Sequence, residues 1–212
     1  MGLTAVVFDV ARPWAVAGFW SDLVEWQIME DGPGRVEVFS KDFTLAFEES
    51  PVPKTVKNRI HLDLASPSAA VQKSIVDRAL SLGATRADIG QRGELPWEVL
   101  ADPAGNEFCV LEPRPEYTGT FAAVVLDAGP IEPAAFDRLG EFWSATTGWP
   151  IHRRHPGQLG LRAPEGTGPW LEVLLDGDPK QVEDRVRFEV TGPGPGPHQD
   201  PEGNEFRVVS PA

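Results

Sequence analysis

The chain of 212 residues contains a single cysteine, Cys109, which excludes an internal disulfide and a zinc site built from cysteines. Because disulfides persist mainly in oxidising compartments, we expect a cytoplasmic protein. No apolar run approaches the roughly 20 residues of a transmembrane helix. Residues 1–30 lack the basic head and apolar stretch of a signal peptide, so no targeting segment is expected.

Positive charge is also scarce, because 19 Lys and Arg residues stand against 32 Asp and Glu residues, for a net charge of −13. A negative surface repels phosphate backbones and anionic lipids, so we expect neither nucleic acid nor a membrane as a partner. The hydrophobic share of 41% is sufficient for a buried core. The length allows two domains of about 100 residues each.

Three segments of the chain recur in the same order. Phe-Trp-Ser at 19–21 returns at 142–144, the strand-like segment 59–64 returns at 185–190, and Asp-Pro-x-Gly-Asn-Glu-Phe at 102–108 returns at 200–206. The first two offsets are 123 and 126 residues, and the third is 98. The order predicts a duplicated domain, 1–113 followed by 119–212, with a linker rich in proline and glycine between them. The smaller offset predicts that the second domain is truncated.

Each copy is built from units with the pattern βαβββ. The first copy predicts helices at 13–24 and 67–83 and strands near 3–10, 26–30, 35–40, 43–49 and 58–65, followed by three more strands, two of them around Gly90 to Gly93. Ser66 is the expected N-cap of the second helix, with Pro67 after it. In the second copy, the matching interval contains Gly-Pro-Gly-Pro-Gly-Pro, which we expect to form neither a helix nor a strand ladder. The truncation therefore removes this helix and the strand that holds Trp97.

Paired βαβββ units that end in Asp-Pro-x-Gly-Asn-Glu-Phe resemble the vicinal oxygen chelate superfamily of glyoxalase, bleomycin-resistance and dioxygenase proteins, and above all its glyoxalase-like domains. The resemblance implies an α+β fold with tandem βαβββ modules. They form cupped mixed or antiparallel sheets, one per domain, with helices on the convex side and a ligand cleft on the concave side. Single-domain relatives pair as homodimers, and here the second copy can take the partner's place. We therefore expect a monomer, or at most a weak homodimer, with apolar surface exposed at Phe188 and Phe206.

The resemblance also implies four metal ligands (His, Glu or Gln) from the first and last strands of the units. The matching positions are Thr4, Ala46, His61 and Cys109 in the first copy, and Ala122, Glu172, Arg187 and Arg207 in the second. Hydroxyl and aliphatic side chains do not hold a divalent ion, and the charge of arginine opposes one. We therefore expect no metal and no other cofactor.

Strand alternation predicts which side chains line each cleft. The first cleft is expected to present Glu48, His61, Glu107 and Cys109, with Phe8 and Trp97 as apolar walls. An imidazole beside carboxylates permits acid–base chemistry. A structural hydrogen bond from His61 to Glu107 or Glu48 is the alternative.

The second cleft is expected to be highly charged. Alternation points five side chains inward: Glu172, Arg187, Glu189, Glu205 and Arg207. Either these groups pair with one another and fill the cleft, or the two arginines form a site for an anion.

Together these features favour metal-independent binding of a small, partly apolar molecule in the first cleft, as in a sequestering or resistance-type protein. One alternative is a lyase or isomerase in which His61 and Glu107 form an acid–base pair, with or without a divalent metal at His61 and Cys109. The other is an interaction protein that has lost its ligand chemistry. The sequence does not distinguish among the three, since a fold does not imply a reaction.

Overall fold

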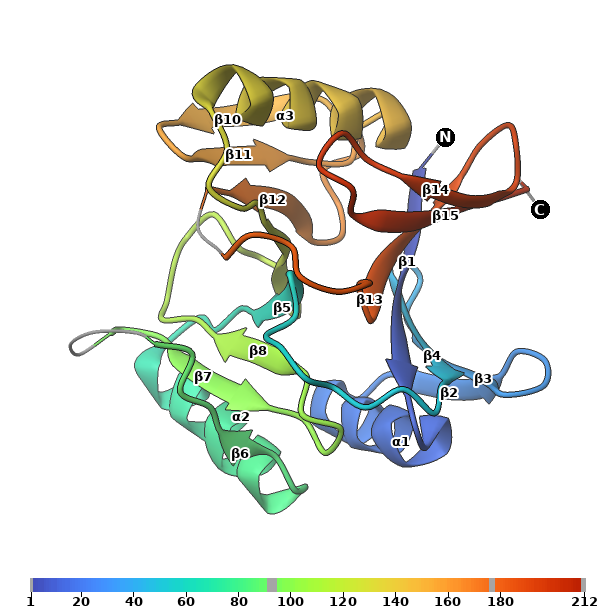
Figure 1. The fold of residues 1–212 in the computed structure, drawn as a ribbon. Helices are drawn as coiled ribbons and strands as arrows, with labels where there is room; N and C mark the ends of the chain where they lie inside the picture. The colour runs from blue at the N-terminus through green and yellow to red at the C-terminus, as the bar shows by residue number, and fades with distance from the viewer. Residues whose placement is uncertain (1, 91–94, 176–177, 211–212) are drawn as a thin grey trace.

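The computed structural model describes residues 2–90, 95–175 and 178–210, which form four successive modules (Figure 1). The first consists of β1 (Gly2–Val10), α1 (Pro13–Val24), β2 (Gln27–Glu30), β3 (Arg35–Phe39) and β4 (Thr44–Glu49). The second consists of β5 (Ile60–Leu64), α2 (Ala69–Ser81), β6 (Thr85–Arg86), β7 (Glu98–Ala101) and β8 (Glu107–Val110). The third consists of β9 (Phe121–Asp127), α3 (Pro133–Thr147), β10 (Ile151–His155), β11 (Gln158–Leu161) and β12 (Trp170–Leu174). The fourth has only β13 (Val186–Thr191), β14 (Gly196–Gln199) and β15 (Glu205–Val209).

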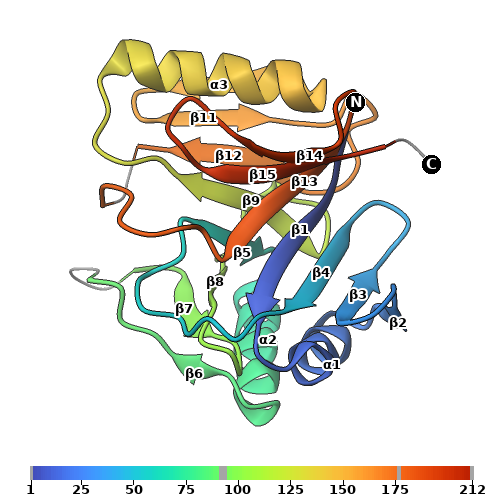
Figure 2. The same ribbon diagram turned by 45° about the vertical axis from the view of Figure 1, so that its right-hand side comes forward.

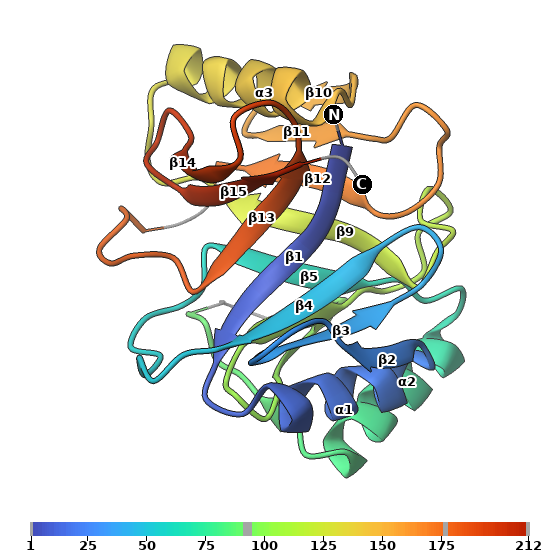
Figure 3. The same cartoon turned by 90° about the vertical axis from the view of Figure 1, so that its right-hand side faces the viewer.

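Each of the two sheets combines modules from both halves of the chain. Sheet A has seven strands in the order β14-β15-β13-β1-β4-β3-β2, and sheet B has eight in the order β10-β11-β12-β9-β5-β8-β7-β6. The halves join through the antiparallel pairs β1–β13 and β5–β9, which cross the view in Figure 3. The expectation of one sheet per domain is therefore wrong. The first strand of every module has an open edge, and in each case a first strand from the other half covers it.

The helix-facing sides of both sheets contribute to one continuous apolar core. Helices α1 and α2 lie together at one end of the molecule, and α3 lies at the opposite end (Figure 2). Wholly buried aromatic side chains from both halves form the centre of this core: Phe8, Trp20, Phe47, Phe108, Trp143 and Phe188. Among the described residues, no helix is both long and apolar enough to cross a membrane.

The two most specific repeats in the sequence contact each other in space. The indole nitrogen of Trp20 donates to Asp102, and that of Trp143 donates to Asp200, both at 3.1 Å. Each aspartate also accepts backbone hydrogen bonds from its own turn, as from Asn106 N to Asp102 Oδ1 at 2.9 Å. The Phe-Trp and Asp-Pro-x-Gly-Asn motifs therefore have a structural role, because they join a helix of one module to a turn of the next.

The truncation of the fourth module differs from the expected one. The Gly-Pro segment does form a strand, β14, which pairs with β15 at the edge of sheet A. Proline is compatible with an edge strand, where its missing N–H can face solvent. Among the described residues, the parts lost are thus the helix and the first hairpin strand, and the counterpart of β7 is retained.

Three local expectations are also corrected. Phe188 and Phe206 are buried, because Trp143 packs against both rings at centroid distances of 4.7 and 5.3 Å. The N-cap of α2 is Ser68, whose hydroxyl accepts from the backbone N–H of Val71. In the predicted turn at 90–93, residues 91–93 lie outside the described part of the chain.

We expect the protein to be monomeric. The first strands of the four modules are already paired with one another within the chain, at β1–β13 and β5–β9. The two phenylalanines of the truncated module are also covered. Light scattering at micromolar concentration should give the mass of one chain, and a stable dimer would contradict this prediction.

Candidate functional site

The side chains that point away from the core form the outer faces of the two sheets. Strand register places Asp9, Glu48, Arg187 and Glu189 on the outer face of sheet A, which we call cup A. It places His61, Asp63, Cys109, Trp170 and Glu172 on the outer face of sheet B, called cup B. Because each sheet draws on both halves of the chain, each cup does too.

Cup A holds an ion-pair network centred on Glu48. This carboxylate accepts hydrogen bonds from Arg35 at 2.9 Å, Arg187 at 2.6 Å and Arg207 at 2.7 Å. Burial alone would raise the pKa of Glu48, but the three guanidiniums outweigh it and lower the pKa to about 2. Glu189 binds Arg35 through both carboxylate oxygens, at 3.0 and 3.1 Å. The arginines expected to offer an anion site are thus occupied by the protein's own carboxylates.

The centre of cup B is a short chain of buried polar groups around His61. Its Nδ1 lies 3.2 Å from Asp63 Oδ1, and its Nε2 lies 3.7 Å from Asp127 Oδ2. Lys57 also binds Asp127. Burial disfavours the charged imidazole, but Asp127 and Asp63 outweigh it and hold the pKa of His61 well above its usual value. The histidine is therefore cationic at neutral pH.

Several buried polar atoms of cup B have no hydrogen-bond partner. Among the described residues, five buried side-chain atoms make no hydrogen bond, and three of them lie on this face: His61 Nδ1 and Asp63 Oδ1, which face each other as an ion pair, and Trp170 Nε1. Apolar groups surround them, including Val99, Leu111, Ala123 and Val125. Buried polar groups in native proteins are normally satisfied, so such a cluster indicates a place for a ligand.

A residue of the linker covers this face. Tyr117 packs against the apolar groups on both sides of cup B, and its hydroxyl donates to Glu172 Oε1 at 2.8 Å. Burial and the charge of Glu172 raise the pKa of the Tyr117 phenol, so the hydroxyl keeps its proton.

The structure separates the residues expected to line the first cleft. Of these, His61 and Cys109 meet in cup B, with Trp97 packed on its apolar side, whereas Glu48 lies in cup A. Phe8 does not wall a cleft, because its ring stacks on Phe47 in the core, with centroids 5.3 Å apart.

The expected His61–Glu107 pair does not form. The carboxylate of Glu107 accepts from Lys54 and from the backbone N–H of Asn58, and the carboxylates nearest His61 are those of Asp63 and Asp127. Glu205 has the same arrangement in the other half, with Lys180 and the N–H of Asp184.

The charged residues expected in a second cleft are likewise divided. Arg187, Glu189 and Arg207 lie in cup A beside Glu48. Glu172 lies in cup B with Tyr117, and Arg153 Nη1 is 3.6 Å from its carboxylate. The pattern identified which side chains point outward, but not which of them share a face.

Three side chains of cup B could hold a divalent ion. Donor atoms of His61, Asp63 and Cys109 lie within 4.8 Å of one another, and an imidazole, a carboxylate and a thiolate suit zinc. Burial raises the pKa of the Cys109 thiol, however, and the His61 pKa is also raised. An ion would have to displace both protons, which weakens binding at neutral pH.

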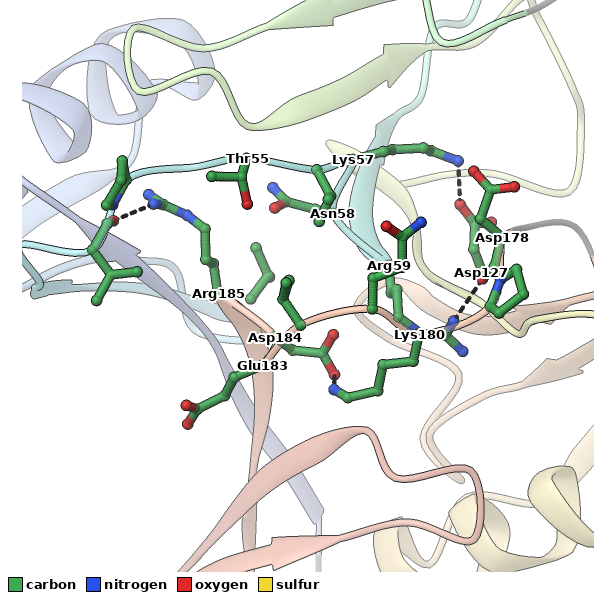
Figure 4. Close-up of a pocket in the computed structure, with 17 residues that line it drawn as sticks. Thr55, Lys57, Asn58, Arg59, Asp127, Asp178, Lys180, Glu183, Asp184 and Arg185 are labelled. Atoms are coloured by element: carbon green, nitrogen blue, oxygen red, sulfur yellow. Dashed lines mark hydrogen bonds and ion pairs between the residues drawn. The ribbon is translucent and has the colours of Figure 1, made fainter.

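A cavity of about 330 Å³ lies between the loops 52–59 and 178–186, and Lys57 and Asp127 of the polar chain around His61 also line it (Figure 4). Arg59 donates to the backbone carbonyl of Asp178 at 3.0 Å, and Arg185 donates to that of Val52 at 2.6 Å. Residues 59 and 185, like 52 and 178, are related by the repeat offset of 126. Each arginine thus binds a backbone carbonyl in the loop of the other half. These two equivalent hydrogen bonds give the loops a structural role.

Comparisons with known proteins agree with this architecture. A family model described as "Glyoxalase-like domain" matches residues 5–111. Glyoxalase I from Zea mays has 14% identity and a TM-score of 0.68, over 99% of this chain and 92% of that one. A putative dioxygenase from Bacillus subtilis has 12% identity and a TM-score of 0.62, over 99% and 85%. At these identities the likeness shows a shared fold. No curated protein matches the sequence.

Proposed function

Because this chain belongs to the glyoxalase-like domain family, we propose that it binds a small, partly apolar molecule in cup B and needs no metal ion to do so. Sequestration of that molecule, as in a resistance-type protein, is the role that follows. A ligand site is typically apolar with a few convergent polar groups, and cup B has this composition. Cup A offers only groups that already satisfy one another.

The observation that carries the proposal is a buried polar cluster on this apolar face: the His61–Asp63 ion pair, whose facing atoms make no hydrogen bond, and the indole N–H of Trp170, which has no acceptor. It presents donors at the imidazolium and the indole and an acceptor at the carboxylate, so a polar group of a ligand could satisfy them together. Leaving the buried indole N–H of Trp170 without an acceptor costs about 1–3 kcal/mol. Binding would recover part of this free energy.

Two matched variants test which cup binds, with 2-naphthol as a fluorescent probe. Ala123 faces cup B beside Asp63 and Trp170, and Ala46 faces cup A beside Val7; both are wholly buried. Ala123→Leu should weaken 2-naphthol binding about tenfold, or about 1.4 kcal/mol. Ala46→Leu should leave it unchanged, and so should dialysis against EDTA. The opposite pattern, or a wild-type protein that does not bind the probe, would sink the proposal.

A second candidate is a metal-supported lyase or isomerase, favoured by the three donor atoms within 4.8 Å of one another. An ion held by His61, Asp63 and Cys109 would supply Lewis-acid polarisation of a substrate oxygen. Elemental analysis of protein purified without chelators separates the two candidates. We expect well under one equivalent of zinc, nickel, iron or manganese. Stoichiometric metal that is lost in Cys109→Ser would favour the enzyme.

A further inference from the structure

Tyr117 is the only tyrosine in the chain, and it reaches cup B from the linker between the two halves. Its ring contacts two separate apolar clusters. One is formed by Val99, Cys109, Leu111 and Ala122, and the other by Ala123, Val125 and Trp170. The ring therefore bridges the middle of the cup, where a bound molecule would contact both sides.

The polar surroundings of this ring resemble those of a bound ligand. The hydroxyl donates to Glu172, whose side chain is only 5% exposed. Arg114 and Arg153 place their guanidinium carbons 6.0 and 5.7 Å from the ring centroid. Cations at this distance stabilise an aromatic ring electrostatically. Arg153 also lies 3.7 Å from the centroid of Trp170, so it would stay in the cup if Tyr117 left.

The segment that carries Tyr117 is fastened mainly at its two ends. Leu111 O accepts from the Ser66 hydroxyl at 2.5 Å, and Thr120 O accepts from the N–H of Ala65 at 3.0 Å. Between these points, residues 112–119 contain neither a helix nor a strand. Withdrawal of Tyr117 would thus break no sheet ladder, and its cost is confined to the contacts of one side chain and its neighbours.

We propose that Tyr117 is an internal occupant of the ligand position in cup B, and that the ligand is an aromatic molecule with a hydrogen-bond donor that replaces it. This inference rests on the proposed function of cup B. The ligand ring takes the place of the phenol ring between the two apolar clusters, and its donor binds Glu172. A further polar atom of the ligand accepts from the indole N–H of Trp170, which Tyr117 leaves without a partner, beside the His61–Asp63 ion pair.

Replacing tyrosine with 3-fluorotyrosine labels this one position, so the ¹⁹F NMR spectrum has a single resonance. Excess p-cresol should move that resonance toward the position of free 3-fluorotyrosine, because the ring passes into solvent. p-Xylene has the same shape without the donor and should leave the resonance in place. If p-cresol or 2-naphthol saturates cup B and the resonance does not move, Tyr117 is not displaced and the inference is wrong.

Tyr117→Ala removes the competing occupant and should bind p-cresol about tenfold more tightly than wild type, with a smaller gain for p-xylene. Tyr117→Phe keeps the ring but loses the hydrogen bond to Glu172, so its affinity for p-cresol should lie between that of wild type and that of Tyr117→Ala. If wild type, Tyr117→Ala and Tyr117→Phe bind p-cresol with equal affinity, the inference is wrong. If Tyr117→Ala gains as much affinity for p-xylene as for p-cresol, the ligand does not need a hydrogen-bond donor. Either result leaves the proposed function standing if Ala123→Leu still blocks 2-naphthol. If Tyr117→Ala does not fold, the ¹⁹F experiment decides alone.

Discussion

Replacing Glu48 with glutamine should lower the free energy of unfolding at neutral pH by about 2–4 kcal/mol. Glutamine preserves the shape of the side chain but removes the charge that faces Arg35, Arg187 and Arg207. Two of these arginines are only 14–15% exposed, so they would be left beside one another with one carboxylate fewer. Urea unfolding at pH 7 measures the change.

The neighbouring residue provides the control. Glu49 is exposed on the same strand, and Glu49→Gln should change stability by no more than about 0.5 kcal/mol. The pKa of Glu48 is lowered to about 2, so its stabilisation is complete above its ordinary pKa of 4.5 and is lost as the pH falls toward 2. The deficit of Glu48→Gln should therefore shrink below pH 4.5. A deficit that is constant with pH would mean that packing, not charge, is responsible.

Replacing Asp184 with asparagine should stabilise the protein at neutral pH by about 1–2 kcal/mol. Burial and the nearby carboxylate of Glu205 raise the pKa of Asp184 to about 6, although Lys180 opposes them. An aspartate with a raised pKa costs stability as the pH rises from about 4 to 6, because the folded state holds a proton that the unfolded state has released. The increase in the free energy of unfolding of Asp184→Asn over wild type should be full above pH 6 and absent near pH 4. Urea unfolding across this pH range measures it.

The first half of the chain supplies the converse variant. Asn58 is related to Asp184 by the repeat offset of 126, and it lies beside Lys54 and Glu107 as Asp184 lies beside Lys180 and Glu205. Asn58→Asp should therefore lose stability at pH 7.5 and recover part of it at pH 4.5. If Asp184→Asn is less stable than wild type at pH 7.5, the ion pair with Lys180 outweighs the burial of the carboxylate.

Much of the fold could be predicted because its signals are local. Helix α1 has the bounds expected from its apolar spacing and its initial proline, and most strands of the first module agree within a residue or two. The repeated Trp and Asp motifs indicated a duplicated unit, and they contact each other in space. The assignment of strands to sheets could not be predicted. Periodicity shows which side of a strand is buried, but not which distant strand lies beside it.

The same limit affected the candidate site. Alternation correctly turned Glu48, His61 and Cys109 to the outer faces, but grouping them by halves of the chain placed Glu48 in the wrong cup. Asp127 was overlooked because it ends a strand of the other half that pairs beside His61. Tyr117 was overlooked because it lies in a proline-rich linker without periodicity. The signal that could have found it is a lone tyrosine in such a segment.

The interleaved sheets also determine the order in which the chain can fold. Leu62 of β5 pairs with Val124 of β9, which follows it by only 62 residues, so sheet B can close its central pair early. Val6 of β1 pairs with Phe188 of β13, which follows it by 182 residues. Contacts between such distant segments form slowly, because a long loop must close first. During synthesis, β1 therefore waits longer than β5 for its partner, and the backbone groups of one of its edges stay unpaired until β13 has been made.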